Sequence, residues 1–248
     1  MPEISTLLLV LFIGIVAGFI DSTVGGGGLI SIPSLIFLGL PPQIAIATDR
    51  LGCIGQSLAA LPKYWRAKKI IWRYVPLFII ISLVSAIIGA NILLNINQLA
   101  LQKIIGVLLL ILLIILFLKP KSGIRSSNPS GWKKILGLLI YFLIMIFGGF
   151  FGGGVGPLIL YTLIFLFGFT VIEVNATKTI PWFLLALSSF IIFALNGIVD
   201  YQKGIVLFVG MALGGYLGAH TALKKGDLWV KRLFAIIVIV SSIKLLFF

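Results

Sequence analysis

The chain has 248 residues, of which 60% are hydrophobic and only 10% are charged, and its mean hydropathy is +1.24. A soluble domain carries about 25% charged residues, so this chain has too little polar surface to cover itself in water and is predicted to be an integral membrane protein. Long apolar runs punctuated by Gly and Pro are typical of an all-α bundle, since the strands of a membrane barrel alternate in shorter segments. With one cysteine and one histidine, an internal disulfide is excluded and neither a metal site nor a cofactor is expected.

The apolar segments predict the membrane helices in chain order. They lie at 4–20, 28–39, 43–62, 74–94, 103–118, 135–149, 155–169, 172–195, 204–223 and 233–248. Those at 28–39 and 155–169 are shorter than the ~20 residues that a helix needs to cross a bilayer core. We therefore expect these two to be tilted, broken or re-entrant, which leaves eight to ten full crossings. The first segment has no cleavage site of small residues after it and is predicted to be a retained span.

The chain is predicted to consist of two homologous halves. A single offset of 129 positions, without gaps, pairs residues of the same type: Gly25 with Gly154, Gly39 with Gly168, Ala47 with Ala176 and Thr48 with Thr177. Because one offset serves the whole length, shared abundance of Gly and Leu is a poor explanation, and a repeat is favoured. The predicted organisation is a first transmembrane repeat at 1–118, a basic cytoplasmic linker at 119–134 and a second repeat at 135–248.

The positive charges predict the topology. Of the 19 Lys and Arg residues, 14 lie in the three stretches 63–73, 119–134 and 224–232, and short basic loops stay cytoplasmic. If all ten segments cross, these stretches share one side and both termini lie outside. With four crossings per half, 224–232 would lie opposite the other two stretches, so two repeats of about five transmembrane segments each are favoured. The loop at 63–73 is strongly basic, whereas its repeat equivalent at 197–203 has Lys203 as its only basic residue. The two halves are therefore predicted to have inverted topology, and the net charge of +13 to orient a multi-pass protein of the inner or plasma membrane rather than to bind nucleic acid.

Two glycine-rich stretches are candidate binding sites. They are Gly25, Gly26, Gly27 and Gly28 in the first half and Gly152, Gly153 and Gly154 in the second. Each separates two hydrophobic segments and precedes a short one, so that backbone N–H groups and the positive end of a helix could face a bound anion. Tight helix packing through small residues is the alternative.

Polar residues at the start of the third segment of each half form the second candidate site. They are Thr48, Asp49 and Arg50 in the first half and Asn175, Thr177 and Lys178 in the second. Ionisable residues in a span usually face a cavity or one another. The hydroxyl and amide groups can donate to an oxyanion whose charge Arg50 and Lys178 balance; alternatively, Asp49 pairs with Arg50 or Lys178 as a structural lock.

Two features leave alternatives open. Asp21, whose place in the second half is taken by Phe150, either carries a coupling proton or caps the next helix, and the cap is favoured. A small-residue face serves either a homodimer contact or packing within one chain; it comprises Gly210, Gly214, Gly215 and Gly218.

A family resemblance rests on the two copies of one motif. Residues 18–48 (GFIDSTVGGGGLISIPSLIFLGLPPQIAIAT) and 148–177 (GGFFGGGVGPLILYTLIFLFGFTVIEVNAT) resemble the repeat motif of the sulfite exporter TauE/SafE family, also described as the TSUP family. The paired motifs of the family fall on Gly25 to Gly28, Thr48, Gly152 to Gly154 and Thr177. The resemblance implies a polytopic carrier of sulfur-containing anions such as sulfite, sulfoacetate and other organosulfonates, or of other small organic anions.

The sequence therefore predicts a secondary transporter and not an enzyme. The anion is expected between the two glycine stretches and to be exposed alternately to each side of the membrane, with proton coupling through Asp21 as one hypothesis. A Walker A motif is absent from the sequence, so direct drive by ATP is not expected. A passive anion channel and a non-transporting membrane scaffold are the alternatives.

Overall fold

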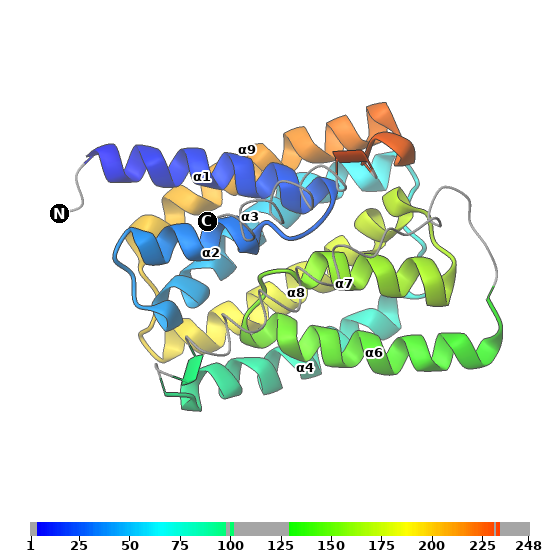
Figure 1. The fold of residues 1–248 in the computed structure, drawn as a ribbon, viewed down its shortest axis with the longest axis horizontal. Helices are drawn as coiled ribbons and strands as arrows, with labels where there is room; N and C mark the ends of the chain where they lie inside the picture. The colour runs from blue at the N-terminus through cyan, green and yellow to red at the C-terminus, as the bar shows by residue number, and fades with distance from the viewer. Residues whose placement is uncertain (1–3, 98–99, 102–128, 231, 234–248) are drawn as a thin grey trace, which may run out of the picture.

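A computed structural model describes residues 4–97, 100–101, 129–230 and 232–233, and the regular structure in these residues is helical (Figure 1). The first half contains α1 (Ile4–Thr23), α2 (Gly28–Phe37), α3 (Pro42–Arg66) and α4 (Val75–Asn95). The second half contains α6 (Gly131–Phe150), α7 (Val155–Thr162), the π-helical turn η1 (Leu163–Phe167), α8 (Val171–Leu195) and α9 (Tyr201–Lys225). These elements confirm the all-α prediction. The predicted segment at 103–118 and nearly all of that at 233–248 lie outside the described residues.

The helices present apolar side chains to their surroundings. Within the described part, α1, α4, α6, α8 and α9 are long and apolar enough to cross a membrane. Large apolar side chains are exposed on these helices, among them Phe12, Ile80, Leu139, Ile191 and Leu213. An apolar surface of this extent suits lipid and not water as the solvent, so the chain is a multi-pass membrane protein.

Helices of one half pack mainly against helices of the other half. By the offset of 129, α1 corresponds to α6 and α4 corresponds to α9. The contact between α1 and α9 has its counterpart in the contact between α6 and α4, and the contact between α3 and α9 has its counterpart in that between α8 and α4. The first and third helices of each half thus pack against the fourth helix of the other half. Each half therefore buries the surface of the other.

Glycines on α9 make the closest of these contacts possible. A Cβ added to Gly210 would lie 2.5 Å from the carbonyl oxygen of Leu11, and one added to Gly214 would meet the carbonyl group of Ile15, both on α1. Gly215 faces α3 in the same way. Of the two alternatives left open by the sequence, the structure shows that this small-residue face packs within one chain.

Two helical hairpins enter the bundle from opposite ends. In Figure 1, α1 runs inward from the end at which the N-terminus lies and α2 returns toward that end, whereas α6 and α7 form a hairpin from the other end. The short segments predicted at 28–39 and 155–169 are these returning arms. The first begins three residues after Gly25 (φ 79°) and the second directly after Gly154 (φ 81°), and both of these glycines are in the left-handed region. We refer to residues Gly25–Gly28 as the first glycine turn and to Gly152–Gly154 as the second glycine turn.

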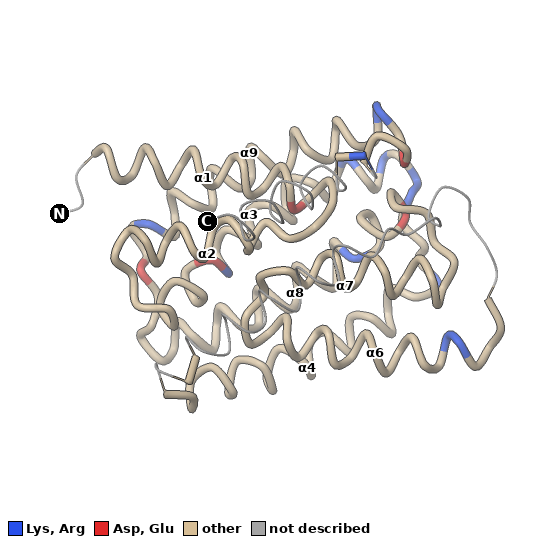
Figure 2. Tube along the Cα trace, viewed as in Figure 1, with Lys and Arg blue, Asp and Glu red and all other residues tan. Residues whose placement is uncertain are grey.

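The positive charges gather at one end of the bundle, as predicted. Lys and Arg residues lie at the end of α3, at the start of α6 and at the end of α9, and these helix ends lie at the same end of the bundle (Figure 2). The described members of all three basic stretches therefore share a side. Lys203, at the start of α9, lies at the opposite end.

Candidate functional site

The two glycine turns are in direct backbone contact inside the bundle. A Cβ on Gly25 would lie 2.5 Å from the Cα of Gly156, and a Cβ on Gly28 would lie 3.0 Å from the Cα of Gly153. Glycine is required here because any side chain would push the two backbones apart. The structure thus brings together the two stretches that the sequence pairs only by their offset.

Asp21 occupies the first glycine turn. Its Oδ1 atom accepts hydrogen bonds from the N–H groups of Gly26 and Gly27, both at 3.0 Å, and the residue is buried. Of the two roles that the sequence leaves open, this geometry is the nearer to a cap, because the carboxylate holds the turn that leads into α2, although α2 itself has no side-chain hydrogen bond at its N-cap. It also means that two of the N–H groups expected to face a bound anion are already paired with a carboxylate of the chain itself.

The second glycine turn has a cation where the first has a carboxylate. The guanidinium of Arg50, a fully buried residue of α3, has its Cζ atom 3.0 Å from the position of a Cβ on Gly152, and its Nη2 atom donates to the carbonyl oxygen of Gly148 at 2.7 Å. In the part of the chain that the structure describes, the Nε and Nη1 atoms of Arg50 have no hydrogen-bond partner. Among the same residues, the N–H groups of Gly153 and Gly154 make no hydrogen bond.

Residues of α8 contact the chain just before the first glycine turn. The Nζ atom of Lys178 lies 3.5 Å from the carbonyl oxygen of Asp21, and the Nδ2 atom of Asn175 donates to the carbonyl oxygen of Thr23. Lys178 and Asn175 are both buried. The third helix of each half therefore carries a cation, Arg50 or Lys178, that lies at the glycine turn of the other half.

Asp49 is also buried, with 1% of its surface exposed. It accepts hydrogen bonds from the hydroxyl of Ser31 and, at 3.4 Å, from the thiol of Cys53. Among the described residues, no opposite charge lies within 4.0 Å of Asp49, so the alternative that the sequence left open, a lock with Arg50 or Lys178, does not form. Asp21, Arg50 and Lys178 also lack such an ion pair within the described part.

Thr48 and Thr177 face the loops and not the glycine turns. The Oγ1 atom of Thr48 accepts a hydrogen bond from the N–H of Asp200, and that of Thr177 accepts one from the N–H of Ile71, both at 3.0 Å. Because Asp200 and Ile71 are also 129 positions apart, these are two equivalent hydrogen bonds exchanged between the halves. The hydroxyl of each threonine therefore contacts a backbone N–H group of the other half.

Three residues near the buried charges were missed as site residues by the sequence analysis. Ser31 and Cys53 are partners of Asp49, and the ring of Trp182 comes within 3.2 Å of the position of a Cβ on Gly148. Cys53 lies one helical turn after Asp49, so that the shared face was a usable signal. For Ser31 the only signal was a hydroxyl within a short apolar segment.

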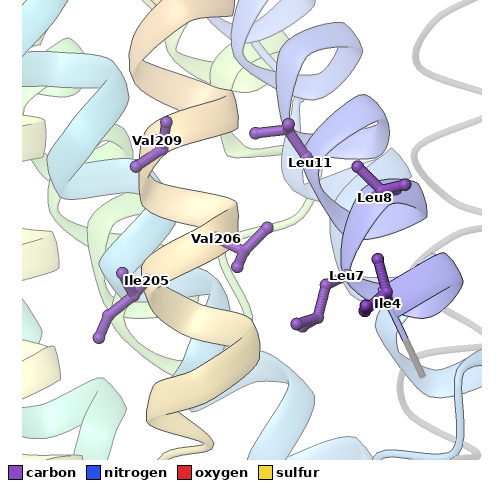
Figure 3. Close-up of a pocket in the computed structure, with 7 residues that line it drawn as sticks. All are labelled: Ile4, Leu7, Leu8, Leu11, Ile205, Val206 and Val209. Atoms are coloured by element: carbon purple, nitrogen blue, oxygen red, sulfur yellow. The ribbon is translucent and has the colours of Figure 1, made fainter. Parts of the chain in front are cut away.

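An apolar groove on the surface of the bundle is a poor binding site for an anion. It lies between α1 and α9, and the side chains that line it are apolar: Ile4, Leu7, Leu8, Leu11, Ile205, Val206 and Val209 (Figure 3). An anion needs hydrogen-bond donors or cations. The buried charges at the glycine turns are therefore the better candidate site.

Comparison with known proteins agrees with the architecture. The sequence model of the family described as sulfite exporter TauE/SafE matches residues 10–245. The chain is 29% identical over 242 residues to a probable membrane transporter protein of Haemophilus influenzae, covering 97% of this chain and 95% of that protein. It is 30% identical to the probable membrane transporter protein ORF9 of Sinorhizobium sp. (97% and 92% covered) and 29% identical to the probable membrane transporter protein YfcA of Escherichia coli (98% and 91% covered). No solved structure matches the chain significantly.

Proposed function

Since this chain belongs to the sulfite exporter TauE/SafE family, we propose that it is a secondary transporter of small anions, with sulfite and organosulfonates such as sulfoacetate as the first candidates. The observation that carries the proposal is the pair of buried cations, Arg50 and Lys178, each at the glycine turn of the other half. A buried cation that lacks an ion pair is costly. A substrate anion bound near the turns would offset that cost.

Alternating access between two inverted repeats is the mechanism we propose. The opposite directions of α1 and α6, the helix contacts between the halves and the crossed hydrogen bonds of Thr48 and Thr177 support it. Substrate sites of transporters built from inverted repeats lie at the interface between the repeats. In this protein that interface includes the contact between the glycine turns, so we expect a relative movement of the halves to separate the turns and open the site to each side in alternation.

Proton coupling through Asp49 is part of the same proposal. The buried site holds two acidic and two basic residues, so that an added anion leaves a net negative charge that one proton would remove. Asp21 is a poorer carrier because two N–H groups hold its carboxylate. The groups that act on the charge of Asp49 come from four helices: Asp21 (α1), Ser31 (α2), Arg50 and Cys53 (α3) and, beyond Asp21, Lys178 (α8).

Flux into proteoliposomes tests the transport proposal. We expect saturable uptake of sulfite or sulfoacetate, with counterflow, from a panel that also includes taurine, sulfate and acetate. Lys178→Ala should abolish uptake because Asp21 then lacks a neighbouring cation, whereas Lys203→Ala, which changes the ion pair at the start of α9, should not. Conductance without saturation would favour a channel, and no flux of any anion from folded protein would contradict the proposal.

Asp49→Asn tests the coupling. Its uptake should no longer respond to an imposed pH gradient, whereas Asp200→Asn, which removes an acidic residue outside the buried site, should respond as the native protein does. If uptake by Asp21→Asn no longer responds to the pH gradient while uptake by Asp49→Asn still does, the proton carrier is Asp21 and not Asp49.

A further inference from the structure

We propose that each chain binds one oxyanion, at the second glycine turn, and that Asp21 is a built-in anion at the first. The inference rests on the proposed function, since it names where in that buried site the anion lies. It follows from a difference between the two halves: the first has a carboxylate, Asp21, where the second has Phe150.

At the first glycine turn the donors are already used. Two backbone N–H groups are paired with the carboxylate of Asp21, and the cation Lys178 lies beside them. The buried side-chain atom near this turn that has no partner among the described residues is an acceptor, Oδ1 of Asn175. A further anion would find negative groups here, so this turn already resembles an occupied site.

At the second glycine turn the unpaired groups are donors. They are Nε and Nη1 of Arg50, both buried and without partners in the described part, together with the N–H groups of Gly153 and Gly154. Arg50 and Trp182 both approach Gly148. Phe150 stands where the first half has Asp21, so no carboxylate of the repeat fills this place. Buried donors without acceptors are disfavoured, and an anion would satisfy them.

The donors define the class of ligand. A guanidinium donates in parallel to two oxygens of one group through Nη2 together with either Nε or Nη1, and the Nη2 atom of Arg50 has a second N–H beside the one that it donates to Gly148. A sulfite, sulfonate or carboxylate group offers such a pair, whereas a halide does not. The substrate is therefore expected to place its oxyanion group at Arg50.

A carboxylate introduced at the second turn gives the sharpest test. Phe150→Asp places a carboxylate at the position that corresponds to Asp21 by the offset of 129 and should act as an internal competitor, weakening sulfite binding by about a hundredfold relative to Phe150→Asn. The asparagine variant has nearly the same shape without the charge, so the comparison separates charge from lost packing. Equal binding by the two folded variants would overturn the proposal.

Arg50 provides a second test that does not depend on residue 150. Arg50→Lys keeps the charge but loses the two parallel donors and should weaken sulfite binding by at least about tenfold, and Arg50→Gln should abolish it. Binding to purified protein can be followed by the fluorescence of Trp182 after Phe replaces the other tryptophans, Trp65, Trp72, Trp132 and Trp229. Chloride should produce no change. Unaltered sulfite binding by Arg50→Lys would overturn the assignment even if Arg50→Gln failed to fold.

The role of Asp21 is tested by stoichiometry. Asp21→Ala frees the N–H groups of Gly26 and Gly27 and should raise the number of sulfite ions bound per chain from one to two, whereas Asp21→Asn should still bind one. A single site in Asp21→Ala would show that Asp21 does not stand in for an anion. Binding that requires Arg50 in a protein without flux would contradict the transport proposal alone, and flux that does not require Arg50 would contradict the subsite alone.

Discussion

Gly25 and Gly39 share a backbone conformation but differ in what surrounds them. Their φ angles are 79° and 89°, in the region where a side chain costs about 1–2 kcal/mol. A Cβ on Gly39 would meet nothing within 4 Å, whereas one on Gly25 would lie 2.5 Å from backbone of the second half. The two glycines therefore separate the cost of the conformation from the cost of the contact between the turns.

We expect Gly39→Ala to lower the free energy of unfolding by about 1 kcal/mol and Gly25→Ala to lower it by about 2 kcal/mol more, the usual cost of overpacking. Denaturation of the purified variants in detergent measures the difference. Gly131→Ala is the control without positive φ or a contact within 4 Å. Equal losses for Gly25→Ala and Gly39→Ala would show that the turns can separate at no cost.

Asp200 is the residue whose charge stabilises the start of α9. Its Oδ1 atom accepts the N–H of Lys203 at 2.9 Å, and its Oδ2 atom lies 2.7 Å from the ammonium group of the same residue. Burial by itself raises the pKa of Asp200, but the hydrogen bonds and charge of Lys203 outweigh it and hold the pKa below its ordinary value.

Because the pKa of Asp200 is lower in the folded protein, the stabilisation is complete above the unfolded pKa of about 4 and is lost as the pH falls through the folded value. Asp200→Asn can still cap α9 but cannot titrate. We therefore expect the variant to be less stable than the native protein at neutral pH and this difference to vanish in acid. Thermal unfolding of both proteins across this range measures it, and a difference that persists below about pH 2 would contradict the assignment.

Between elements, two threonines tie the third helix of each half to a loop of the other. Thr48 on α3 accepts the N–H of Asp200, which precedes α9, and Thr177 on α8 accepts the N–H of Ile71, which precedes α4. Both threonines are fully buried. Each hydroxyl thus links the third helix of one half to the loop before the fourth helix of the other half.

Thr48→Val and Thr177→Val should each lower the free energy of unfolding by about 1–3 kcal/mol, because a backbone N–H loses its acceptor while the side-chain volume is kept. Hydrogen exchange should accelerate at Asp200 in the first variant and at Ile71 in the second. Thr221→Val is the matched control, since that exposed hydroxyl donates to its own helix. Faster exchange at neither amide would contradict the crossed bonds.

At the scale of the whole molecule, the charged end of the bundle sets its orientation. The basic ends of α3 and α9 lie together, whereas the loop between α8 and α9 lies at the opposite end (Figure 2). Short basic segments remain in the cytoplasm. We therefore expect the loop between α3 and α4 to face the cytoplasm and the loop between α8 and α9 to face outward.

Single cysteines test this orientation because native Cys53 is buried. In sealed right-side-out vesicles, a membrane-impermeant maleimide should label Asn196→Cys, and it should label Lys69→Cys only after the membrane is opened. Both positions are exposed in the structure. The reverse pattern would invert the molecule, and the native chain serves as the unlabelled control.

The sequence by itself determined the class of the protein and most of its elements. Long apolar runs, basic stretches and glycines are local signals, so the membrane location, the described helices and the short returning arms could be predicted from them. The offset of 129 also paired the two glycine stretches before any contact was known. The candidate residues were found in the same way, because polar groups stand out in apolar segments.

The tertiary structure alone decided which of these residues meet. Arg50 reaches a carbonyl 98 positions away, and Lys178 reaches one 157 positions away. No local pattern encodes such contacts, since they depend on how the helices of the two halves pack against each other. For this reason the sequence placed Thr48 and Thr177 with the anion and left Asp21 open, whereas packing placed the two hydroxyls on loops and the carboxylate of Asp21 on the first glycine turn.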